Sequence, residues 1–344
     1  MSQFVILAPG AFDYIKNKTG NMLIRYREKE VRAVIDPQKA GKTAQEVLGF
    51  GGRIPVIGTF EEADSAADTL VVGNAPQGGL LSPFHRQEIE KGIKAGCRII
   101  NGMHQFLNDD QSLSALALKH NVKLSDLRKP PSPPHFPRGS WKHRKFPVLL
   151  IVGTDCDTGK MTTGWEICRQ LNQRGRNVRF LGTGQTGILL SGNGVPIDAV
   201  VGDFMAGEIE YALDRMGGET DLVIVEGQGS LSSMLYAGVT LGLMHGAMPD
   251  YMIMTHEPTR TKDVSNYKMA SIGTVMNMHL DLIKHFKDSV FLGINLLTFN
   301  LDKEAALKSI LDTENEFNIP AADLVRFGAG DLINSIENAI FNKF

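Results

Sequence analysis

The sequence predicts an α/β protein with two successive domains, each built on a doubly wound parallel sheet. Short apolar runs recur along the whole chain, and stretches of helical periodicity separate them. Strands that alternate with helices in this way form parallel sheets whose two faces are covered. A chain of 344 residues also exceeds the usual size of one domain, so two hydrophobic cores are expected.

Four apolar runs mark the expected strands of the first domain, which we place over residues 1–127. These runs are residues 3–8, 31–35, 69–73 and 97–100. A stretch of helical periodicity at 83–95 separates the last two, and the alternation predicts a Rossmann-like domain. Its first strand ends in Ala8, Pro9 and Gly10 instead of GxGxxG, so the pattern that binds a dinucleotide is missing.

Two features of the first domain lie where open sheets bind ligands. Asp36 follows the second strand and could contact a ribose, but a carboxylate that caps the turn before Pro37 is the stronger interpretation. Gly73, Asn74 and Gly78 follow the third strand and form a weaker candidate for a second ligand site. The sequence therefore leaves the role of this domain open.

Residues 128–147 have the composition of a linker between the two domains. They contain six prolines and six lysine or arginine residues, and no acidic residue occurs between Asp126 and Asp155. Proline-rich chain is extended and semi-rigid. In the simpler interpretation its positive charge is solvated; in the alternative, the segment folds against the phosphate site described below and adds cations to it.

Composition excludes several partners and settings. The formal net charge of -2, from 36 basic and 38 acidic residues, gives no reason to expect a nucleic-acid partner. No apolar run approaches the roughly 20 residues that cross a bilayer, and the amino terminus lacks the pattern of a signal peptide, so no membrane partner is expected. Cys97, Cys156 and Cys168 are an odd set without metal-type spacing, which favours a reduced, cytoplasmic setting without a metal site.

The second domain is expected over residues 148–344 and repeats the doubly wound pattern. Its short apolar runs are residues 148–152, 177–181, 221–225, 250–254 and 290–295. A helix is expected to follow the first run from about residue 160 to 174 and to end near Gly175. The carboxyl ends of these parallel strands should meet at one edge of the sheet.

The turn between the first strand and this helix has the form of a phosphate-binding loop. Backbone N–H groups in such a turn, with those of the following helix, favour an anion, and Lys160 adds a positive charge. The motif GxxxxGK[ST] places a hydroxyl for Mg²⁺ after the lysine. Here five residues separate Gly153 from Gly159, and Met161 takes the hydroxyl position. The phosphate cradle is intact, whereas the usual magnesium ligand is missing, and the second domain is expected to be P-loop NTPase-like.

We expect the whole loop and the first turn of the helix to line the phosphate site. These residues are Gly153, Thr154, Asp155, Cys156, Asp157, Thr158, Gly159, Lys160, Met161, Thr162 and Thr163.

Polar residues follow other strands of the second domain, at the edge that should face the loop. Glu226 either positions Mg²⁺ or water, as such acids do in P-loop enzymes, or caps the next turn. Asp203 is an N-cap or a catalytic base, and the sequence does not separate these. His256, Arg260 and Lys262 follow the fourth strand and suit carboxylate or phosphate recognition.

Two resemblances follow from these motifs. The loop and the GluGlyGlnGly turn are similar to those of dethiobiotin synthetase and its P-loop relatives, which share the long glycine spacing. A narrower resemblance covers nearly the whole chain. It adds the proline-rich joint, GluGlyGlnGlySerLeu at 226–231, HisGluProThrArg at 256–260 and ArgPheGlyAlaGly at 326–330. On these motifs the chain resembles the DUF1611 family, whose bacterial members act as D-glutamate N-acetyltransferases with acetyl-CoA as the donor.

The resemblance implies a division of roles within the second domain. Residues 153–163 would bind the phosphates of coenzyme A, which need no metal-supported γ-phosphate. Glu226, Asp203 and His256 are the candidates for the catalytic base, and backbone N–H groups near residues 227–229 would stabilise the oxyanion. The substrate-binding candidates are Gln185, Gln228, Arg260 and Lys262, the last two for the carboxylates of D-glutamate.

Other functions stay open at this point. A kinase or ligase of the dethiobiotin-synthetase type would bind Mg-ATP through Glu226 and a late threonine. A regulatory protein would bind a nucleotide without turnover. In each case the expected partner is a small molecule, and two sheet-based domains of this kind often pair in a homo-oligomer.

Overall fold

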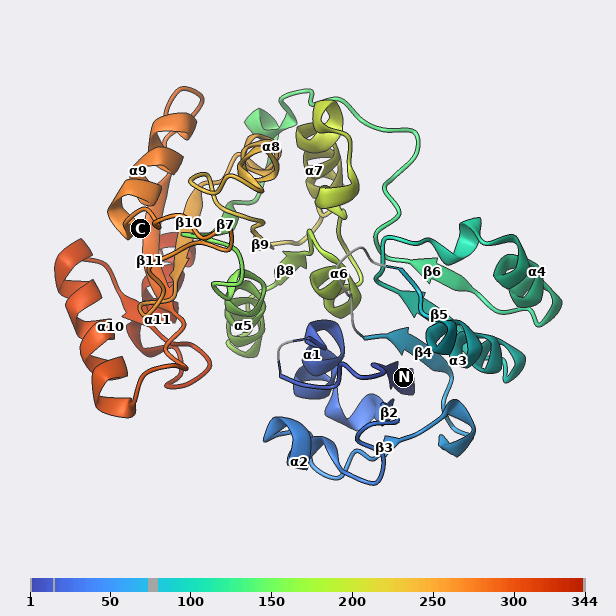
Figure 1. The fold of residues 1–344 in the computed structure, drawn as a ribbon. Helices are drawn as coiled ribbons and strands as arrows, with labels where there is room; N and C mark the ends of the chain where they lie inside the picture. The colour runs from blue at the N-terminus through green and yellow to red at the C-terminus, as the bar shows by residue number, and fades with distance from the viewer. Residues whose placement is uncertain (1, 15, 74–79, 343–344) are drawn as a thin grey trace. The chain divides into compact units, whose positions relative to one another are not determined.

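The computed structural model describes residues 2–14, 16–73 and 80–342 (Figure 1). The chain divides into two compact units, Met1–Lys129 and Pro130–Phe344. Each unit contains one six-stranded sheet in which all strand pairs are parallel. The predicted fold class, a Rossmann-like domain followed by a P-loop domain with a doubly wound sheet, is confirmed.

The first unit has the strand order β3-β2-β1-β4-β5-β6, which is the order of a Rossmann fold. Its strands are β1 (Phe4–Leu7), β2 (Val31–Ile35), β3 (Val56–Ile57), β4 (Thr69–Val72), β5 (Arg98–Asn101) and β6 (Leu124–Asp126). Its α-helices are α1 (Lys18–Tyr26), α2 (Ala44–Leu48), α3 (Pro83–Lys94) and α4 (Gln111–Lys119). The four predicted strands are β1, β2, β4 and β5. The edge strands β3 and β6 span only two and three residues, too short to show as apolar runs.

Asp36 is a structural residue of the first unit. Its buried carboxylate accepts hydrogen bonds from the backbone N–H groups of Gly10 (2.9 Å), Phe12 (3.2 Å) and Gln38 (3.1 Å). The carboxylate thus caps its own turn and also closes the loop after β1, as the capping interpretation predicts. The weaker ligand candidate after β4 cannot be described in full, because Asn74 and Gly78 lie outside the described residues.

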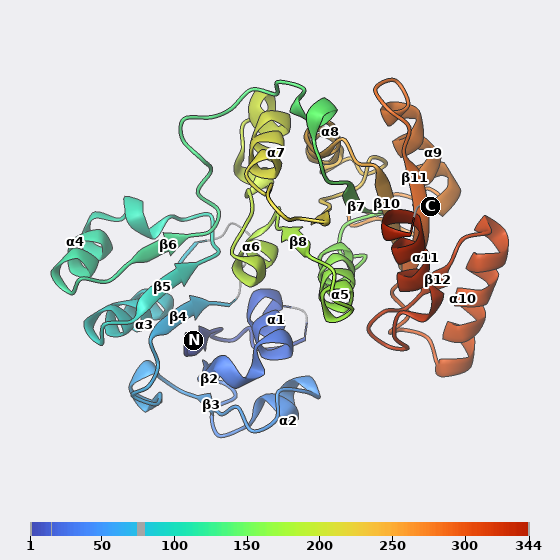
Figure 2. The same ribbon diagram turned by 180° about the vertical axis from the view of Figure 1, so that it is seen from behind.

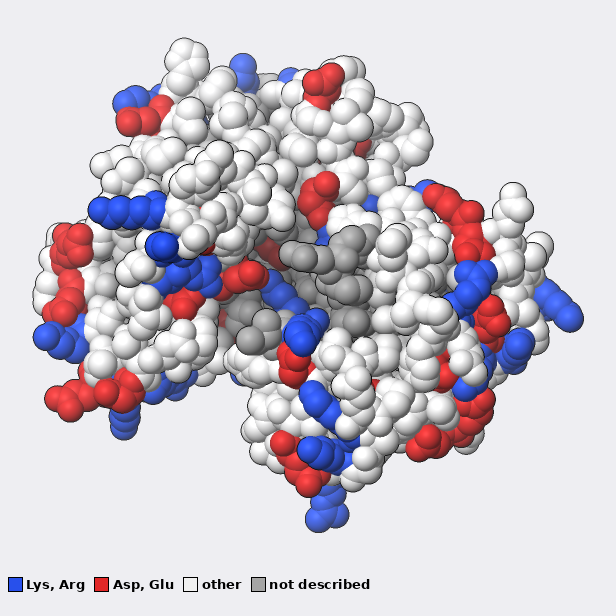
Figure 3. Space-filling view, viewed as in Figure 1, with Lys and Arg blue, Asp and Glu red and all other residues white. Residues whose placement is uncertain are grey.

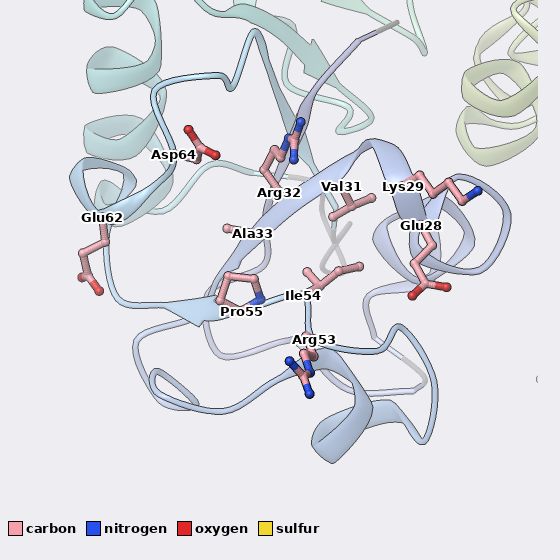
Figure 4. Close-up of a pocket in the computed structure, with 10 residues that line it drawn as sticks. All are labelled: Glu28, Lys29, Val31, Arg32, Ala33, Arg53, Ile54, Pro55, Glu62 and Asp64. Atoms are coloured by element: carbon pink, nitrogen blue, oxygen red, sulfur yellow. The ribbon is translucent and has the colours of Figure 1, made fainter.

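A surface cavity of about 510 Å³ lies in the first unit beside the start of β2 (Figure 4). Its lining residues are Glu28, Lys29, Val31, Arg32, Ala33, Arg53, Ile54, Pro55, Glu62 and Asp64. Figure 4 shows basic and acidic side chains around a small apolar floor. Because Val31 is the first residue of β2, this cavity is at the amino end of the strand, opposite the edge where open sheets hold ligands.

The second unit has the strand order β12-β11-β10-β7-β9-β8 (Figures 1 and 2). Its strands are β7 (Val148–Gly153), β8 (Val178–Leu181), β9 (Leu222–Val225), β10 (Tyr251–His256), β11 (Val290–Leu296) and β12 (Ala321–Ala322). Its α-helices are α5 (Lys160–Gln173), α6 (Gln185–Ser191), α7 (Met205–Asp214), α8 (Ala237–Ala247), α9 (Ile272–Ile283), α10 (Lys303–Phe317) and α11 (Gly330–Phe341). The five predicted strands and the first helix are all present, and β12, a two-residue strand, is the addition.

The central strand β7 explains why the phosphate loop stands on a rigid base. Val148, Leu150 and Val152 pack into one core cluster with residues of α7, α8 and α9. Leu149 and Ile151 pack into a second cluster with residues of α5 and α11 on the opposite face. Since both faces are covered, every residue of β7 is apolar or glycine, which is the continuous run seen in the sequence.

The proline-rich segment packs into the second unit from residue 130 onward. Buried Glu208 accepts a hydrogen bond from the His135 backbone N–H (2.7 Å), and the His135 ring stacks on Tyr211. Gly207 permits this approach, because a Cβ there would lie 2.0 Å from the His135 carbonyl oxygen. Arg144 donates to the carbonyl oxygen of Ala247 at the end of α8 (2.7 Å). The segment is therefore held by α7 and α8, and these described contacts do not involve the phosphate loop.

Surface charge and hydropathy add two observations. On the face drawn in Figure 3, basic and acidic side chains are interspersed on both units. Within the described ranges, no helix combines the length and the apolar character that crossing a membrane requires.

Candidate functional site

The phosphate loop joins the central strand of the second sheet to the start of α5. β7 lies between β10 and β9, so the loop is flanked by the turns that follow both of these strands. The N-cap of α5 is Gly159, with a φ of 90° and no side-chain capping bond. A glycine at this place adopts the left-handed backbone without strain, and it has no side chain that competes for the first N–H groups of the helix. The first N–H groups of α5 therefore have no side-chain cap, and a helix start of this kind favours an anion.

Gly153 gives the loop its tight packing against β10. A Cβ at Gly153 would lie 2.5 Å from Thr158 Oγ1 and 2.6 Å from Thr255 Oγ1. These two hydroxyls are themselves hydrogen-bonded at 2.7 Å, and both threonines are fully buried. The threonines thus fix the shape of the loop from inside and leave its outer side for a ligand.

Lys160 folds back across the loop. Its Nζ donates to the carbonyl oxygen of Asp155 at 2.5 Å, and only 7% of the residue is exposed. Nζ also lies above Gly153, where a Cβ would approach it to 3.2 Å. The lysine charge is therefore concentrated at the loop, as the motif predicts.

The hydroxyls near Lys160 are arranged differently from those of a magnesium-binding loop. Met161 is buried in the position that usually carries the hydroxyl. Thr163 Oγ1 accepts a hydrogen bond from Asn295 Nδ2 on β11 (2.9 Å), so this hydroxyl ties α5 to the sheet. Thr162 is half-buried. Among the described residues, no cluster of three or more His, Cys, Asp or Glu side chains has a geometry that could hold a metal ion.

Arg260 is bound to two carboxylates within the protein. Its Nη1 donates to Asp155 Oδ2 (3.2 Å) and to the carbonyl oxygen of Cys156 (2.7 Å). Its Nε donates to Glu257 Oε2 at 2.8 Å. Asp155 is fully buried and also accepts from the backbone N–H of Val264 at 2.8 Å. In this structure Arg260 therefore supports the loop, whereas the sequence suggested a substrate contact for it.

His256 ends β10 beside the loop. Its Nδ1 and Thr154 Oγ1 are hydrogen-bonded at 2.8 Å. The pKa of His256 is lowered to about 4, mainly by burial; the charge of Glu257 opposes this change and the charge of Arg260 adds to it. The imidazole is therefore neutral at neutral pH, and it is a weaker base than a free histidine.

Glu226 follows β9 and fastens the turn after β8. Its Oε2 accepts hydrogen bonds from the backbone N–H groups of Thr183 (2.9 Å) and Gly184 (3.3 Å). Gly187 must be glycine for this contact, since a Cβ there would lie 2.1 Å from Glu226 Oε2. The carboxylate caps a turn, as the simpler interpretation of this residue holds, but the turn belongs to a different strand.

Gln228 and Gly227 bring this turn close to Lys160. Gln228 Nε2 donates to Thr183 Oγ1 at 3.1 Å. A Cβ on Gly227 would lie 1.7 Å from the Ile151 carbonyl oxygen and 3.1 Å from Lys160 Cδ. Gln185, the first residue of α6, follows the same turn and is half-buried. Gly227 therefore lies beside the loop, and Glu226 and Gln228 join the turn after β9 to the turn after β8.

The described contacts do not bring two of the predicted residues, Asp203 and Lys262, to the phosphate loop. Asp203 is exposed in a short 3₁₀ helix, Gly202–Phe204, ahead of α7, and makes no side-chain cap to that helix. Lys262 is exposed on a hairpin beyond Arg260. Of the remaining loop residues, Cys156 is half-buried and Asp157 is exposed with a φ of 55°.

The structure also adds residues that sequence reasoning missed. Thr183, Thr255 and Glu257 are buried and support the loop or its neighbours, and each lies within the first three residues after a predicted strand. His279 on α9 is fully buried, with Nδ1 bonded to the Val275 carbonyl oxygen (2.7 Å) and no partner for Nε2 among the described residues. Burial lowers the pKa of His279 to about 4, and the charge of Lys160 contributes. In the sequence, His279 lies within an apolar helical stretch, and nothing there indicates that it is near Lys160.

Known proteins resemble both units of this chain. The model of a P-loop domain of unknown function, DUF1611_C, matches residues 135–333, and that of the Rossmann-like domain DUF1611_N matches residues 37–130. A protein of Tritonibacter scottomollicae named D-glutamate N-acetyltransferase is 38% identical over 283 residues, covering 81% of this chain and 84% of its own. A protein of the same name from a Pseudoalteromonas species is 35% identical over 279 residues, covering 80% of this chain and 83% of its own.

A solved structure extends the match to the fold as a whole. The crystal structure of a DUF1611 family protein from Anabaena variabilis aligns with a TM-score of 0.91 and 32% identity, over 98% of this chain and 100% of that one. The resemblance predicted from the loop, the GluGlyGlnGly turn and the proline-rich joint is confirmed. The chain is a member of the DUF1611 family, with a Rossmann-like domain followed by a P-loop domain.

Proposed function

We propose that the protein is an N-acetyltransferase that transfers the acetyl group of acetyl-CoA to the amino group of D-glutamate. The observation that carries this proposal is the match to two relatives with that name, each over at least 80% of this chain. The loop around Lys160 supplies a physical basis, since it offers an anion site on a rigid strand.

The phosphate loop would bind the pyrophosphate of the acyl donor. Coenzyme A is bound through phosphates that stay intact during the reaction, so the enzyme needs donors and positive charge rather than a metal-assisted leaving group. Met161 in place of a hydroxyl and the bond that engages Thr163 with Asn295 both suit this use. A loop that cleaves ATP would lose more from this arrangement.

Acetyl transfer then requires a base and an oxyanion site. The neutral amine attacks the thioester carbonyl, a C–N bond forms, the C–S bond breaks, and the amine proton leaves to a base. His256 is the best-placed base by position, because it is adjacent to the loop and bonded through Nδ1 to Thr154, although the burial that keeps its ring neutral also weakens it as a proton acceptor. Glu226 is the second candidate, although two backbone N–H groups already bind its Oε2. Asp203 is exposed ahead of α7 and ranks last.

The amino-acid substrate would lie at the turns beside the loop. Gln185 and Gln228 flank the turn after β8 and can bond to carboxylate or amine groups. The backbone of residues 227–229 lies next to Lys160 and would face the developing oxyanion. Arg260 would act indirectly, by holding Asp155 and the loop in place.

A thiol-release assay tests this function directly. We expect free coenzyme A to form from acetyl-CoA in the presence of D-glutamate, much less with L-glutamate, and without added magnesium. ATP with Mg²⁺ should release no ADP in a parallel assay. ADP release without thiol release would instead support a kinase or ligase, and tight nucleotide binding without either product would support a regulatory protein.

A further inference from the structure

We propose that Lys262 and Lys268 form a second anion site beside the phosphate loop, and that it binds the 3′-phosphate of the acyl donor. The inference rests on the proposed function, because it assigns both sites to one acyl-CoA ligand. It also assigns Lys262 to binding of the acyl donor, whereas the sequence suggested that this lysine binds the amino-acid substrate.

A short hairpin brings the two lysines together. Lys262 and Lys268 form an antiparallel bridge. The hydrogen bonds on either side run from Asp263 N to the Tyr267 carbonyl oxygen (2.8 Å) and from Met269 N to the Thr261 carbonyl oxygen (3.0 Å). Lys262 and Lys268 are therefore a non-hydrogen-bonded pair, the kind whose side chains approach most closely and project from the same face.

The side chain of Asp263 orders the hairpin turn. Asp263 Oδ1 accepts hydrogen bonds from the backbone N–H groups of Ser265 (2.9 Å) and Tyr267 (2.8 Å). Asn266 in the turn has a φ of 68°, a backbone that asparagine tolerates. The acid between the two lysines in the sequence is thus engaged in shaping the turn.

The two ammonium groups lie at the surface. Both lysines are exposed, and the ion pairs among the described residues include neither of them. Like charges placed directly opposite each other on paired strands repel and destabilise the pair. A ligand that carries two negative charges would replace the repulsion between the lysines with attraction to both of them.

The hairpin is fastened to the phosphate loop. The Val264 backbone N–H donates to Asp155 Oδ2 at 2.8 Å, and Arg260 at the base of the hairpin donates to Asp155 and Cys156. An anion held by the lysine pair would therefore lie next to an anion held by the loop. A ligand with two phosphate groups a short distance apart matches this arrangement.

The chemistry of the acyl donor indicates that the lysine pair binds its 3′-phosphate. In coenzyme A the pyrophosphate and the 3′-phosphate are attached to the same ribose, whereas the thioester lies at the far end of the pantetheine arm. The amino acid must meet the thioester, which the proposed function places at the turns after β9 and β8, whereas the lysine hairpin follows β10 on the other side of β7. A phosphate monoester also carries close to two negative charges at neutral pH, and lysines bind phosphate as point charges.

Equilibrium binding of acetyl-CoA and 3′-dephospho-acetyl-CoA tests the assignment. We expect the unmodified protein to bind acetyl-CoA roughly tenfold or more tightly, as charge-assisted hydrogen bonds to one phosphate allow. In Lys262→Gln/Lys268→Gln this preference should fall to near unity, while affinity for the dephospho compound changes little. The preference of the unmodified protein should also weaken as salt is added.

A matched control removes the same amount of charge elsewhere. Lys303 and Lys308 are exposed on α10, so Lys303→Gln/Lys308→Gln should keep the preference of the unmodified protein. Equal binding of the two donors by the unmodified protein would overturn this inference and leave the proposed function standing, whereas no binding of either donor would overturn both. A donor preference that survives in the hairpin variant, or a rise only in the KM for D-glutamate, would also overturn the inference.

Discussion

The two units have similar parallel sheets, but the loop after β1 in the first unit differs from the loop after β7 in the second. In the first unit, the loop after β1 is closed by buried Asp36, whose carboxylate binds the backbone N–H groups of Gly10 and Phe12. In the second unit, the loop after β7 also contains a buried aspartate, Asp155, but its carboxylate binds Arg260 and the Val264 N–H on the neighbouring hairpin. The first loop is closed by a carboxylate of its own unit, whereas in the second loop the start of α5 has no side-chain cap.

The position of a loop at the carboxyl end of a central parallel strand is therefore not sufficient for a phosphate site. Both loops stand at the carboxyl ends of central strands, where open sheets bind ligands. What distinguishes them is the direction of one carboxylate, together with Gly159 at the N-cap and Lys160 across the loop. Four experiments would break or sharpen this comparison.

The largest effect is expected from adding a methyl group at the turn next to the phosphate loop. Gly227→Ala would put a Cβ 1.7 Å from the backbone oxygen of Ile151, which cannot move without disturbing β7. We expect the free energy of unfolding to fall by about 3 kcal/mol or more. Thermal or denaturant unfolding measures this change.

The matching position in the first unit provides the contrast. A Cβ at Gly73 would meet the side chains of Asn17 (2.5 Å) and Ile6 (2.6 Å), which can shift more readily than backbone. Gly73→Ala should therefore cost less than Gly227→Ala. Gly238 on α8 has open space around it, so Gly238→Ala should be neutral or slightly stabilising. Equal losses at Gly73 and Gly227 would contradict the difference in packing.

Removing the charge of the phosphate loop should affect the ligand far more than the fold. In Lys160→Ala we expect affinity for acetyl-CoA to fall about a hundredfold, since a charge-assisted contact to phosphate is lost. Isothermal titration calorimetry with acetyl-CoA measures this. Asp36→Asn should do the reverse, lowering stability while leaving acetyl-CoA affinity unchanged, because the described hydrogen bonds of the Asp36 carboxylate are to loop N–H groups of its own unit. Unchanged affinity in Lys160→Ala would contradict the site.

Buried histidines should make both units sensitive to acid. Burial lowers the pKa of His85 in the first unit and of His279 in the second to about 4. The unfolded chain binds a proton near its ordinary pKa of about 6.5, so stability is complete above that pH and is lost as pH falls from there toward 4.

At pH 5 we expect His279 alone to cost about 2 kcal/mol of stability relative to pH 7.5. The free energy of unfolding of His279→Gln, measured across this range, should vary less with pH than that of the unmodified protein. His85→Gln provides the same measurement for the first unit. A pH profile identical in all three proteins would show that these groups do not titrate as described.

The smallest effect is expected at Arg260. Arg260→Gln leaves the carboxylates of Asp155 and Glu257 without their shared partner, and the loop should lose its fixed position. We expect about a tenfold loss of acetyl-CoA affinity with little change in the KM for D-glutamate. Arg260→Lys keeps the charge but not the fork of donors and should recover only part of the affinity. A rise confined to the KM for D-glutamate would instead indicate that Arg260 binds the substrate, as the sequence suggested.

Much of the architecture could be predicted because it depends on neighbours in the sequence. The continuous apolar run of β7 predicts a strand buried on both faces, and Gly153, Gly159 and Lys160 predict the loop that follows it. The composition of residues 128–147 was less informative about their place in the structure. Proline and basic residues suggested a linker, but acceptors on α7 and α8, including Glu208 and the Ala247 carbonyl oxygen, bind this segment into the second unit.

The partners of the polar side chains could be known only from the folded chain. Glu226 binds the N–H of a residue 43 positions away, and Arg260 binds a carboxylate 105 positions away. Local periodicity carries no information about such pairs, because they depend on which strands become neighbours in the sheet. The sequence is therefore sufficient for the strands, the P-loop and the family, whereas the order of the strands in the sheet decides which residues a charged side chain meets.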